Sequence, residues 1–550
     1  MKIKGMRFLL LPVLLAAPFF SLSGRTNDVP RIVNIINFVR AIEPRDINVT
    51  EDVLYETVLN QAELMQEYGL TGTFLLQYDA LVMPRYQKLM KELVSKGFEV
   101  GGWWEITQPH VEAAGMHWRG RYPWDWHADV GFATGYTPQE REKLVDVYME
   151  KFHSVFGEYP TSVGSWFIDA HTLAYMHEKY GIVASCNCKD QVGTDGYTLW
   201  GGYWNQAYYP SRLNGYMPAQ TEEGQIPVPV FRMLGSDPVY QYDTGLGHTI
   251  QGVITLEPVY PDAGGSETWV RRFLDAICEA PCIGFNYAQA GQENSFTWKA
   301  MGKALKMQFS LLDSLEEAGR IRLETLGASG RWFRENYRVT PPTSVTVLED
   351  TYGNGNRTVW YDSRFYRANI LWDGESVRFR DIHIFDERVK SDYVDSKGTS
   401  NQCIYEACPV LDGFRWSTPQ EYAAIRFFEG SEGNFREMKL SGADVSTSGK
   451  DAMCLEFRSA DGNRYTVRME EDGIELKGGT GRMDWRLCLS VPEGRALPLT
   501  VTDDGKSLKS EKKGIEYGLT LTKGRFIRSG NSVWMVPEKG VLSMDCSGSR

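Results

Sequence analysis

Apolar runs alternate with amphipathic segments over the first 320 residues of the chain. Seven runs are short and bounded by breakers or charges, which predicts strands, at residues 31–39, 72–76, 98–104, 162–168, 182–186, 228–234 and 283–287. Between them, apolar positions recur at helical spacing, at residues 51–69, 84–96, 138–156, 266–280 and 297–320. Strands that alternate with helices pair in parallel, so this part is predicted to be α/β, as a parallel (β/α)7-type barrel.

The hydrophobic pattern changes after the breakers Thr340-Pro341-Pro342-Thr343. The apolar segments beyond them are short and alternate with polar positions, and turns such as Asp461-Gly462-Asn463 divide them. This texture predicts a C-terminal antiparallel β-sandwich. We therefore expect a barrel catalytic domain at residues 25–338 and a sandwich domain at residues 339–550.

The first 24 residues have the pattern of a secretory signal peptide. Lys2, Lys4 and Arg7 precede an apolar run at residues 8–20, and small residues follow it. The run contains prolines and is too short to span a bilayer, and we expect no membrane span elsewhere. The mature protein is therefore expected to be periplasmic or secreted.

Composition narrows the class of partner. The net charge of −12 argues against a nucleic-acid partner, which would need a basic face. Aromatic residues make up 13% of the chain, more than packing needs, and suggest surfaces that stack on sugar rings. Nine cysteines at loose spacings match no zinc motif, so we expect mostly free, buried thiols, with room for one disulfide bridge. The oligomeric state is not predicted.

Acidic residues follow several of the predicted strands. In a parallel barrel, catalytic groups gather at the carboxyl ends of the strands, and glycoside hydrolysis uses two carboxyl groups across the scissile bond. The candidates for catalysis are Asp169, Glu257 and Glu105. Asp169 has an alternative role, because an acid between a strand and a helix also caps the helix.

Aromatic and polar residues near the same strand ends are candidates for substrate binding: Trp103, Trp104, Trp126, Trp166, Trp204, Arg232, Asp237, Tyr287, Gln289 and Glu293. The alternative for the aromatic residues is core packing. Arg232 and Arg40 each have two candidate roles. One is contact with a sugar hydroxyl or a uronate carboxylate, and the other is pairing with nearby acids.

Two short motifs resemble known enzymes. Gly164-Ser165-Trp166-Phe167-Ile168-Asp169 is similar to the nucleophile segment of family 38 α-mannosidases, and residues 98–105 resemble the strand before it. Residues 72–103 also resemble polysaccharide deacetylases of the NodB type. Both belong to a glycoside hydrolase/deacetylase superfamily of seven-stranded barrels that includes family 57. The resemblance implies Asp169 as the nucleophile and Glu257 or Glu105 as the acid/base.

The chain departs from these families at their metal ligands. The mannosidases use His-x-Asp on the first strand, and the deacetylases use Asp-Asp there with a His-x-x-x-His after the third. Here the first strand leads into Val39-Arg40-Ala41, and a single His110 follows the third. We therefore expect no catalytic metal and no other cofactor.

The predicted function is an exported, metal-independent glycoside hydrolase that cleaves an oligo- or polysaccharide through a pair of carboxylates. Two alternatives remain open: a carbohydrate deacetylase of the same superfamily, and a glycan-binding barrel without catalysis.

Overall fold

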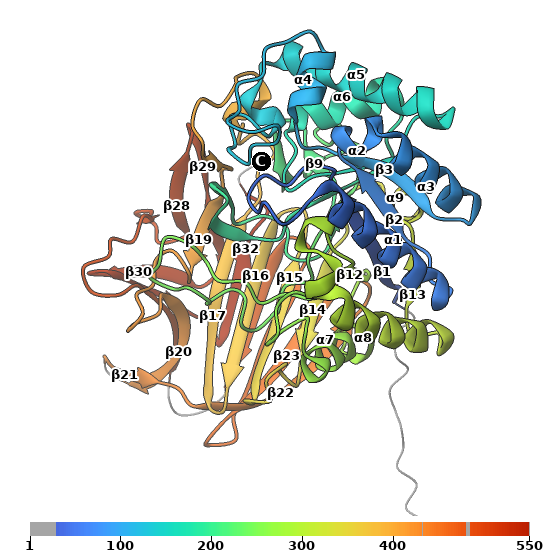
Figure 1. Cartoon of the computed structure of the whole chain (residues 1–550). Helices are drawn as coiled ribbons and strands as arrows, with labels where there is room; N and C mark the ends of the chain where they lie inside the picture. The colour runs from blue at the N-terminus through green and yellow to red at the C-terminus, as the bar shows by residue number, and fades with distance from the viewer. Residues whose placement is uncertain (1–28, 432, 480–483, 549–550) are drawn as a thin grey trace, which may run out of the picture.

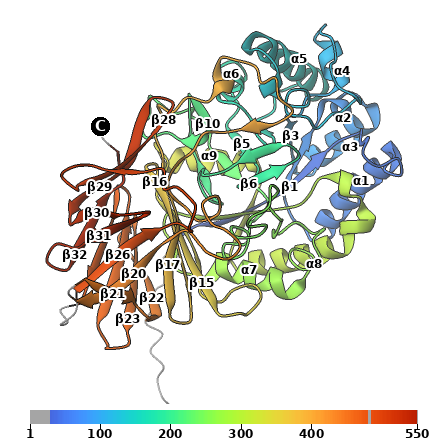
Figure 2. The same ribbon diagram turned by 90° about the vertical axis from the view of Figure 1, so that its left-hand side faces the viewer.

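The structure is a computed structural model that describes residues 29–431, 433–479 and 484–548. Figures 1 and 2 show two blocks packed side by side: a domain of helices around a sheet, drawn in blue to green, and an all-β domain, drawn in yellow to red. The first block ends with α9 (Leu326–Asn336) and the second begins with β14 (Thr343–Val347).

Within the described residues, the main sheet of the first block has the order β12-β1-β2-β3-β4-β5-β11-β8, and β13 also pairs with β1. The strands β12 to β11 in this order run parallel, and only the short β8 is antiparallel. In the described residues β11 does not pair with β12, so the barrel is open at this one position and is nearly, but not fully, closed. The predicted α/β barrel with a C-terminal antiparallel sandwich is confirmed. The bounds are β1 Arg31–Val39, β2 Thr73–Leu76, β3 Glu99–Trp103, β4 Ser162–Gly164, β5 Ala184–Asn187, β8 Ala207–Tyr208, β11 Val230–Arg232, β12 Asn286–Ala290 and β13 Arg322–Glu324.

The barrel helices follow local rules. α5 begins at a capping box in which Thr137 and Glu140 bond reciprocally, and it ends at Gly157 in the left-handed conformation. Its predicted range is therefore confirmed to the residue. The short α2 and α4 and the helix α9 were not predicted. The bounds are α1 Glu51–Glu67, α2 Tyr78–Val82, α3 Pro84–Ser95, α4 Gln108–Ala113, α5 Pro138–Phe156, α6 Ala170–Tyr180, α7 Glu267–Glu279 and α8 Trp298–Glu317.

The segment between β5 and β11 carries small sheets. β6 (Gln191–Thr194) and β7 (Tyr197–Leu199) form a hairpin, and β9 (Pro210–Ser211) pairs with β10 (Asn214–Pro218). The hairpin turns at Asp195-Gly196, both in the left-handed conformation, which this turn chemistry favours. These strands extend the barrel toward the second domain.

The second domain consists of two large antiparallel sheets among the described residues. One has the order β14-β15-β16-β17-β20-β26-β31-β30, with β19 and β21 beside it, and the other has β22-β23-β24-β25-β32-β29-β28-β27. The bounds are β15 Asn356–Asp362, β16 Tyr366–Asp373, β17 Ser376–Ile384, β19 Cys408–Asp412, β20 Ala424–Ser431, β21 Asn434–Glu437, β22 Leu440–Ser448, β23 Ala452–Ser459, β24 Arg464–Glu470, β25 Gly473–Gly478, β26 Asp484–Ser490, β27 Thr500–Val501, β28 Ser507–Lys512, β29 Ile515–Lys523, β30 Arg525–Ser529, β31 Ser532–Val536 and β32 Val541–Asp545.

One segment of the second domain returns to the barrel. Residues 391–408 leave the sandwich after β17, and β18 (Cys403–Ile404) pairs in parallel with β7 of the barrel hairpin. Gly398 N bonds to the carbonyl of Thr134 at 2.7 Å, which ties the segment to the barrel a second time. The orange strand near α6 in Figure 2 belongs to this returning segment.

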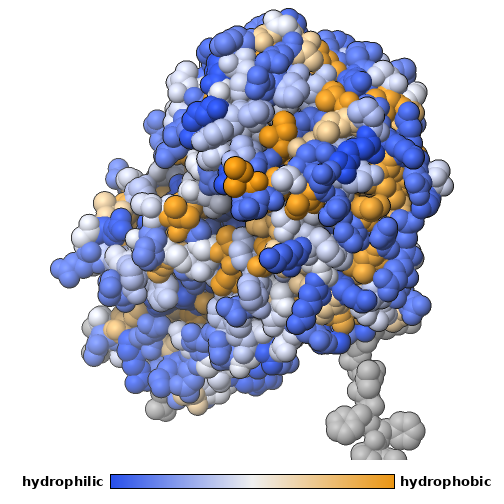
Figure 3. Space-filling model, in the orientation of Figure 1, coloured by the Kyte–Doolittle hydropathy of each residue, from blue (hydrophilic) through white to orange (hydrophobic). Residues whose placement is uncertain are grey.

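Polar residues cover most of the face in Figure 3, with apolar residues scattered between them. No helix in the described ranges is long and apolar enough to cross a membrane. The predicted signal peptide lies outside the described residues. All nine cysteines are free, and all except Cys454 are buried, as expected for most of them.

Candidate functional site

A cavity of about 390 Å³ lies at the carboxyl ends of the barrel strands. Its wall contains Glu43 beyond β1, Trp166 beyond β4, Lys189 beyond β5, Leu234 beyond β11 and Glu293 beyond β12. These residues are far apart in the sequence, and the parallel sheet brings them to one edge. Active sites of (β/α) barrels occur at this edge, so the cavity is the candidate active site.

Two of the predicted acids face this cavity, Glu257 and Glu293. Gln292 links them, because its Nε2 donates to Glu257 Oε1 at 2.9 Å and its Oε1 accepts from the backbone N of Glu293 at 2.8 Å. Thr255 Oγ1 bonds to the second oxygen of Glu257 at 2.7 Å. Burial raises the pKa of Glu257 above its ordinary value, although these hydrogen bonds act in the other direction.

Glu293 is in a different electrostatic environment. Arg40 Nη2 lies 2.9 Å from Glu293 Oε2, and Ser295 Oγ donates to Oε1 at 2.6 Å. Glu257 and Glu293 therefore differ in their surroundings: burial raises the pKa of Glu257 among hydrogen-bond donors, and Glu293 has a buried guanidinium beside it. Hydrolases assign acid and base roles to two carboxyl groups through such a difference in environment.

Arg40 occupies the floor beneath the cavity. The same Nη2 lies 3.0 Å from Glu105 Oε1, and Nη1 lies 3.5 Å from Glu43 Oε2. Arg40 thus joins the carboxylates of Glu43, Glu105 and Glu293. Trp124 packs against the guanidinium, 4.2 Å from ring centroid to Cζ.

Glu105 lies below the cavity and is absent from its wall. Gln77 Nε2 donates to its Oε2 at 2.7 Å, and Arg40 holds the other oxygen. Burial raises the pKa of Glu105 to about 7, against the effect of Arg40. Its predicted role as an acid/base has no direct path to a substrate in the cavity, so we assign Glu105 to the support of Arg40.

Lys189 is a site residue that the sequence did not indicate. It lines the cavity, yet only 1% of its surface is exposed. In the described part of the chain, its Nζ makes a hydrogen bond of 3.3 Å to the carbonyl of Asp190. Burial lowers the pKa of its ammonium, opposed by the nearby Cys188 and Glu257. A lysine after a strand is ordinarily a surface residue, so only the fold identifies this one.

Aromatic side chains complete the cavity. Trp166, Tyr197 and Tyr260 line it, and Trp166 is half-buried. The Trp166 ring packs edge-on against Trp103, with 5.3 Å between centroids. Trp126 lies outside the wall, 5.9 Å from the guanidinium carbon of Arg45, which lines the rim. Of the predicted aromatic contacts, Trp166 is in the cavity and Trp126 is near its rim.

The structure places Asp169 away from the cavity. It caps α6, where Oδ1 accepts from the backbone N of Thr172 at 2.9 Å, and it pairs with the buried Arg141 at 2.9 Å. Arg141 also donates to the carbonyls of Tyr393 and Ser396 in the returning segment. The alternative role as a helix cap is confirmed, and the placement does not support the nucleophile expected from the resemblance.

Four predicted aromatic contacts lie in packed cores. Trp103 stacks on Phe38 inside the barrel, and Trp104 faces the helices beside His110. Tyr287 packs against Phe231 in the barrel interior. Trp204 stacks on Trp360 of the sandwich, with centroids 3.8 Å apart, and therefore belongs to the domain interface.

Three polar candidates are occupied by protein partners. Arg232 pairs with Asp190 at 2.9 Å, which confirms the alternative given for it. Asp237 Oδ1 accepts from the backbone N of Val239 at 2.8 Å and shapes a turn. Gln289 Oε1 accepts from the backbone N of Leu234 at 2.8 Å and fixes the chain beyond β11. These residues shape the site without lining it.

The described residues do not form the metal-binding donor set that the resemblance to deacetylases implies. No group of three or more His, Cys, Asp and Glu side chains among them is arranged to hold an ion. At the end of β1 stands Arg40, whose guanidinium lies among three carboxylates. A fixed cation in that position opposes a metal ion, so the residues present do not fit one there.

Comparisons with known protein families and with curated proteins found no match. Among solved structures, the chain is similar to a candidate glycoside hydrolase/deacetylase from Parabacteroides distasonis, at 16% identity over 72% of this chain and 89% of the other, with a TM-score of 0.47. A candidate polysaccharide deacetylase from Mycobacterium smegmatis matches 57% of this chain and 94% of its own at 13% identity and a TM-score of 0.36. A 4-α-glucanotransferase from Thermococcus litoralis matches 94% and 97% at 10% identity and a TM-score of 0.32.

Proposed function

We propose that this protein is a carbohydrate-active hydrolase, and that it cleaves glycosidic bonds with Glu257 as the acid and Glu293 as the anionic carboxylate. The observation that carries this proposal is the presence of Glu257 and Glu293 in one cavity, where burial raises the pKa of Glu257 and a guanidinium nitrogen of Arg40 lies 2.9 Å from Glu293. Glu257 takes the acid role in place of Asp169, which lies outside the cavity.

The reaction would begin with a glycan seated between the two carboxyl groups. Glu257 would donate its proton to the glycosidic oxygen as the bond to the anomeric carbon breaks. Glu293 would then bond to that carbon or remove a proton from an attacking water, and the net change is the addition of one water. Arg40 pairs with Glu293 and orients its carboxylate, and Trp166 offers a partly exposed ring on which a sugar can stack.

A substrate screen tests the proposal. Purified protein is incubated with plant, host and microbial glycans and with aryl glycosides, and new reducing ends are measured. We expect cleavage of at least one glycan, and a loss of kcat of about 10² to 10⁴ in Glu257→Gln and in Glu293→Gln. Cleavage that persists at the parent rate in both variants would contradict the assignment.

Carbohydrate deacetylation is the second candidate, because it is the activity named for several similar structures. It is tested in the same incubations by measuring released acetate, with and without added zinc, cobalt or magnesium. Acetate release that requires added metal would replace glycoside cleavage as the function. Binding without either product would favour a glycan-binding barrel.

We also propose export of the protein, on the basis of the N-terminal pattern alone. Expression of the full chain in a bacterium with an outer membrane, followed by fractionation and N-terminal sequencing, tests it. A mature protein that begins near residue 25 in the periplasm or the medium is the expected result.

A further inference from the structure

A buried charge network connects the sandwich to the residue that follows Lys189. Asp190 Oδ1 accepts from Arg232 Nη2 at 2.9 Å and from the hydroxyl of Tyr216. Asp190 Oδ2 accepts from the backbone N of Gly201 at 3.0 Å and from Arg367 Nη1 at 2.5 Å. Four donors thus hold one carboxylate, and Arg367, on β16, is the donor that the sandwich contributes.

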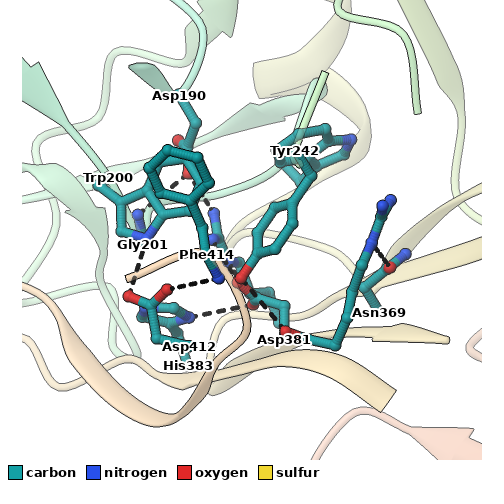
Figure 4. Close-up of polar contacts among 12 residues, drawn as sticks. Asp190, Trp200, Gly201, Tyr242, Asn369, Asp381, His383, Asp412 and Phe414 are labelled. Atoms are coloured by element: carbon teal, nitrogen blue, oxygen red, sulfur yellow. Dashed lines mark hydrogen bonds and ion pairs between the residues drawn. The ribbon is translucent and has the colours of Figure 1, made fainter. Parts of the chain in front are cut away.

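The sandwich fixes Arg367 from its other side. Arg367 Nε and Nη2 each lie 2.8 Å from one oxygen of Asp381 on β17, a two-pronged pairing. His383 Nδ1 bonds to Asp381 Oδ1 at 3.0 Å. Figure 4 shows Asp190 at one end of this cluster and Asp381, His383 and Asp412 at the other. Burial raises the pKa of Asp381, but Arg367 and His383 outweigh it and hold that pKa below its ordinary range.

The network lies in the protein interior. Arg367 and Asp381 are fully buried, and Asp190 is 3% exposed. Buried pairs with matched geometry fix one arrangement, because any displacement leaves a desolvated charge without a partner. The four donors therefore hold Asp190 in place. Because Lys189 is the residue before it, they also hold the backbone of Lys189.

Lys189 itself has unused hydrogen-bonding capacity. An ammonium has three donors, and in the described residues one of them has a partner, the carbonyl of Asp190 at 3.3 Å. The side chain is 1% exposed and lines the cavity. Its remaining donors have no protein acceptor among the described residues, in a side chain that forms part of the cavity wall.

The other charges of the cavity indicate what Lys189 would contact. Arg45 is paired with Glu43 at 2.6 Å, and Glu293 is paired with Arg40. Asp46 and Asp195 also line the wall, so acidic side chains outnumber basic ones around a ligand even with Glu257 protonated as the proposed acid. A uronate or sulfated sugar would meet this negative field. A neutral, hydroxyl-rich sugar would instead receive hydrogen bonds from the ammonium.

We infer that Lys189 is a substrate-binding residue for neutral glycans, and that Arg367 of the sandwich is the positioning residue that holds it in place through Asp190. The inference rests on the proposed function only in taking the cavity as the glycan site. The sandwich then has a defined task in the active site of the barrel.

The test uses labelling of Lys189 by cyanate, which adds across an N–H bond of a neutral amine and gives a urea without a leaving group. The full chain is labelled across a pH series, and the rate constant at Lys189 is read by peptide mass spectrometry. Parent protein is compared with Arg367→Lys and with Arg380→Lys. Arg380 is equally buried and also crosses to the barrel, at Val239 and Pro238, and its other hydrogen-bond partners in the described chain are Asn369 and Asp243 rather than Asp190.

We expect Arg367→Lys to change the Lys189 rate constant at least about threefold, since half a pKa unit alters the neutral fraction by that factor. Arg380→Lys should leave it within error. Melting temperatures of the two variants identify any general loss of structure. Equal effects in both variants would overturn the positioning role. If Arg367→Lys does not fold, His383→Gln, which weakens the hold on Asp381, takes its place with the same expectation.

Protection from labelling tests the binding role. Cellohexaose, xylohexaose and mannohexaose are each added to the parent protein, and reducing ends are measured in the same tubes. An oligosaccharide at ten times its Kd should slow labelling of Lys189 about tenfold. Cleavage without protection would overturn the role of Lys189 and leave the proposed function standing. Protection without cleavage would support Lys189 and count against the proposed hydrolysis. If none of the three oligosaccharides protects Lys189 and none is cleaved, the preference for neutral glycans is overturned.

Discussion

Glu257 and Glu293 differ in what surrounds their carboxyl groups. Glu257 is buried beside neutral donors, whereas Glu293 has a guanidinium at 2.9 Å. Burial raises the pKa of the first, and the second is paired with a cation. The same residue type therefore stands in two different electrostatic environments within one cavity.

The pH dependence of activity follows from this difference. The pKa of Glu257 is raised, so the proton donor persists to a higher pH than in a free glutamic acid. We expect the alkaline limb of kcat/KM to fall above the ordinary glutamate value of about 4.3. Aryl glycosides with a good leaving group need less protonation, so Glu257→Gln should lose less activity on them. Equal losses on good and poor leaving groups would argue against the acid role.

The raised pKa of Glu105 should make the stability of the protein depend on pH. Its pKa is raised to about 7 in the folded state, so above the unfolded value of about 4.3 the folded state binds more protons than the unfolded state. The unfolding free energy should therefore fall as the pH rises from about 4.3 to 7. Glu105→Gln should flatten this decline by about 1 to 3 kcal/mol, as measured by urea titrations at several pH values. The pKa of Asp79 is also raised to about 7, so the unfolding free energy of Glu105→Gln should still fall somewhat with pH.

At this scale the sequence could indicate acids at strand ends, and Glu257, Glu293 and Trp166 are in the cavity wall. It could not separate Asp169 from them, because a carboxylate at a strand-to-helix junction suits a cap as well as a nucleophile. The sequence did offer the pairing of Arg40 with acids, and the structure has it. Lys189 was beyond local pattern, since its burial in the cavity wall depends on residues brought there from other strands.

Among the elements, α6 shows how a cap can serve the tertiary structure. Asp169 begins the helix and holds Arg141 of α5, and Arg141 in turn holds the returning segment through Tyr393 and Ser396. One carboxylate thus joins two helices and the sandwich domain. Its burial explains why an acid stands there without lining the cavity.

Asp169→Asn should therefore be a stability variant. The amide can still cap the helix, but it leaves Arg141 without a buried counter-ion, at a cost of about 3 to 5 kcal/mol. We expect a lower melting temperature with nearly unchanged kcat per folded molecule. Glu142→Gln is the matched control, because Glu142 pairs with His171 at the surface and should cost less than about 1 kcal/mol. A large loss of kcat in well-folded Asp169→Asn would restore the nucleophile hypothesis.

Element prediction was strongest where local signals agree. α5 has a capping box, a clear apolar face and a terminal glycine, and its range was predicted to the residue. α9 was missed because Gly327 and Gly330 interrupt its pattern. These glycines allow close contact: a Cβ at Gly330 would lie 2.4 Å from that of Ala184 on β5. Tertiary packing there outweighs helix propensity.

For the whole molecule, the interface between barrel and sandwich has the character of a core. Trp204 and Trp360 stack face to face across it, and Trp200, Tyr242 and Phe414 pack beside them. Arg367 and Arg380 add buried charge pairs. Domains joined through such an interface unfold together.

Calorimetry should therefore show one cooperative transition for the full chain. Trp360→Ala should lower its midpoint through a loss of about 3 to 5 kcal/mol, the usual cost of removing a large buried aromatic side chain. Trp534→Ala, at a partly buried position on the sandwich strand β31, should cost less. Two separate transitions in the parent protein would contradict the coupling.

The pairing of β18 with β7 has a consequence for the evolution and engineering of this chain. The hairpin that it stabilises contributes Gln191, Thr194 and Tyr197 to the cavity wall, so a cut at the Pro341-Pro342 junction would separate the candidate site from a segment that supports it. Replacing the sandwich with one from another protein would remove that support. Recombination at that junction should yield an inactive chimaera unless residues 391–408 are carried over with the barrel.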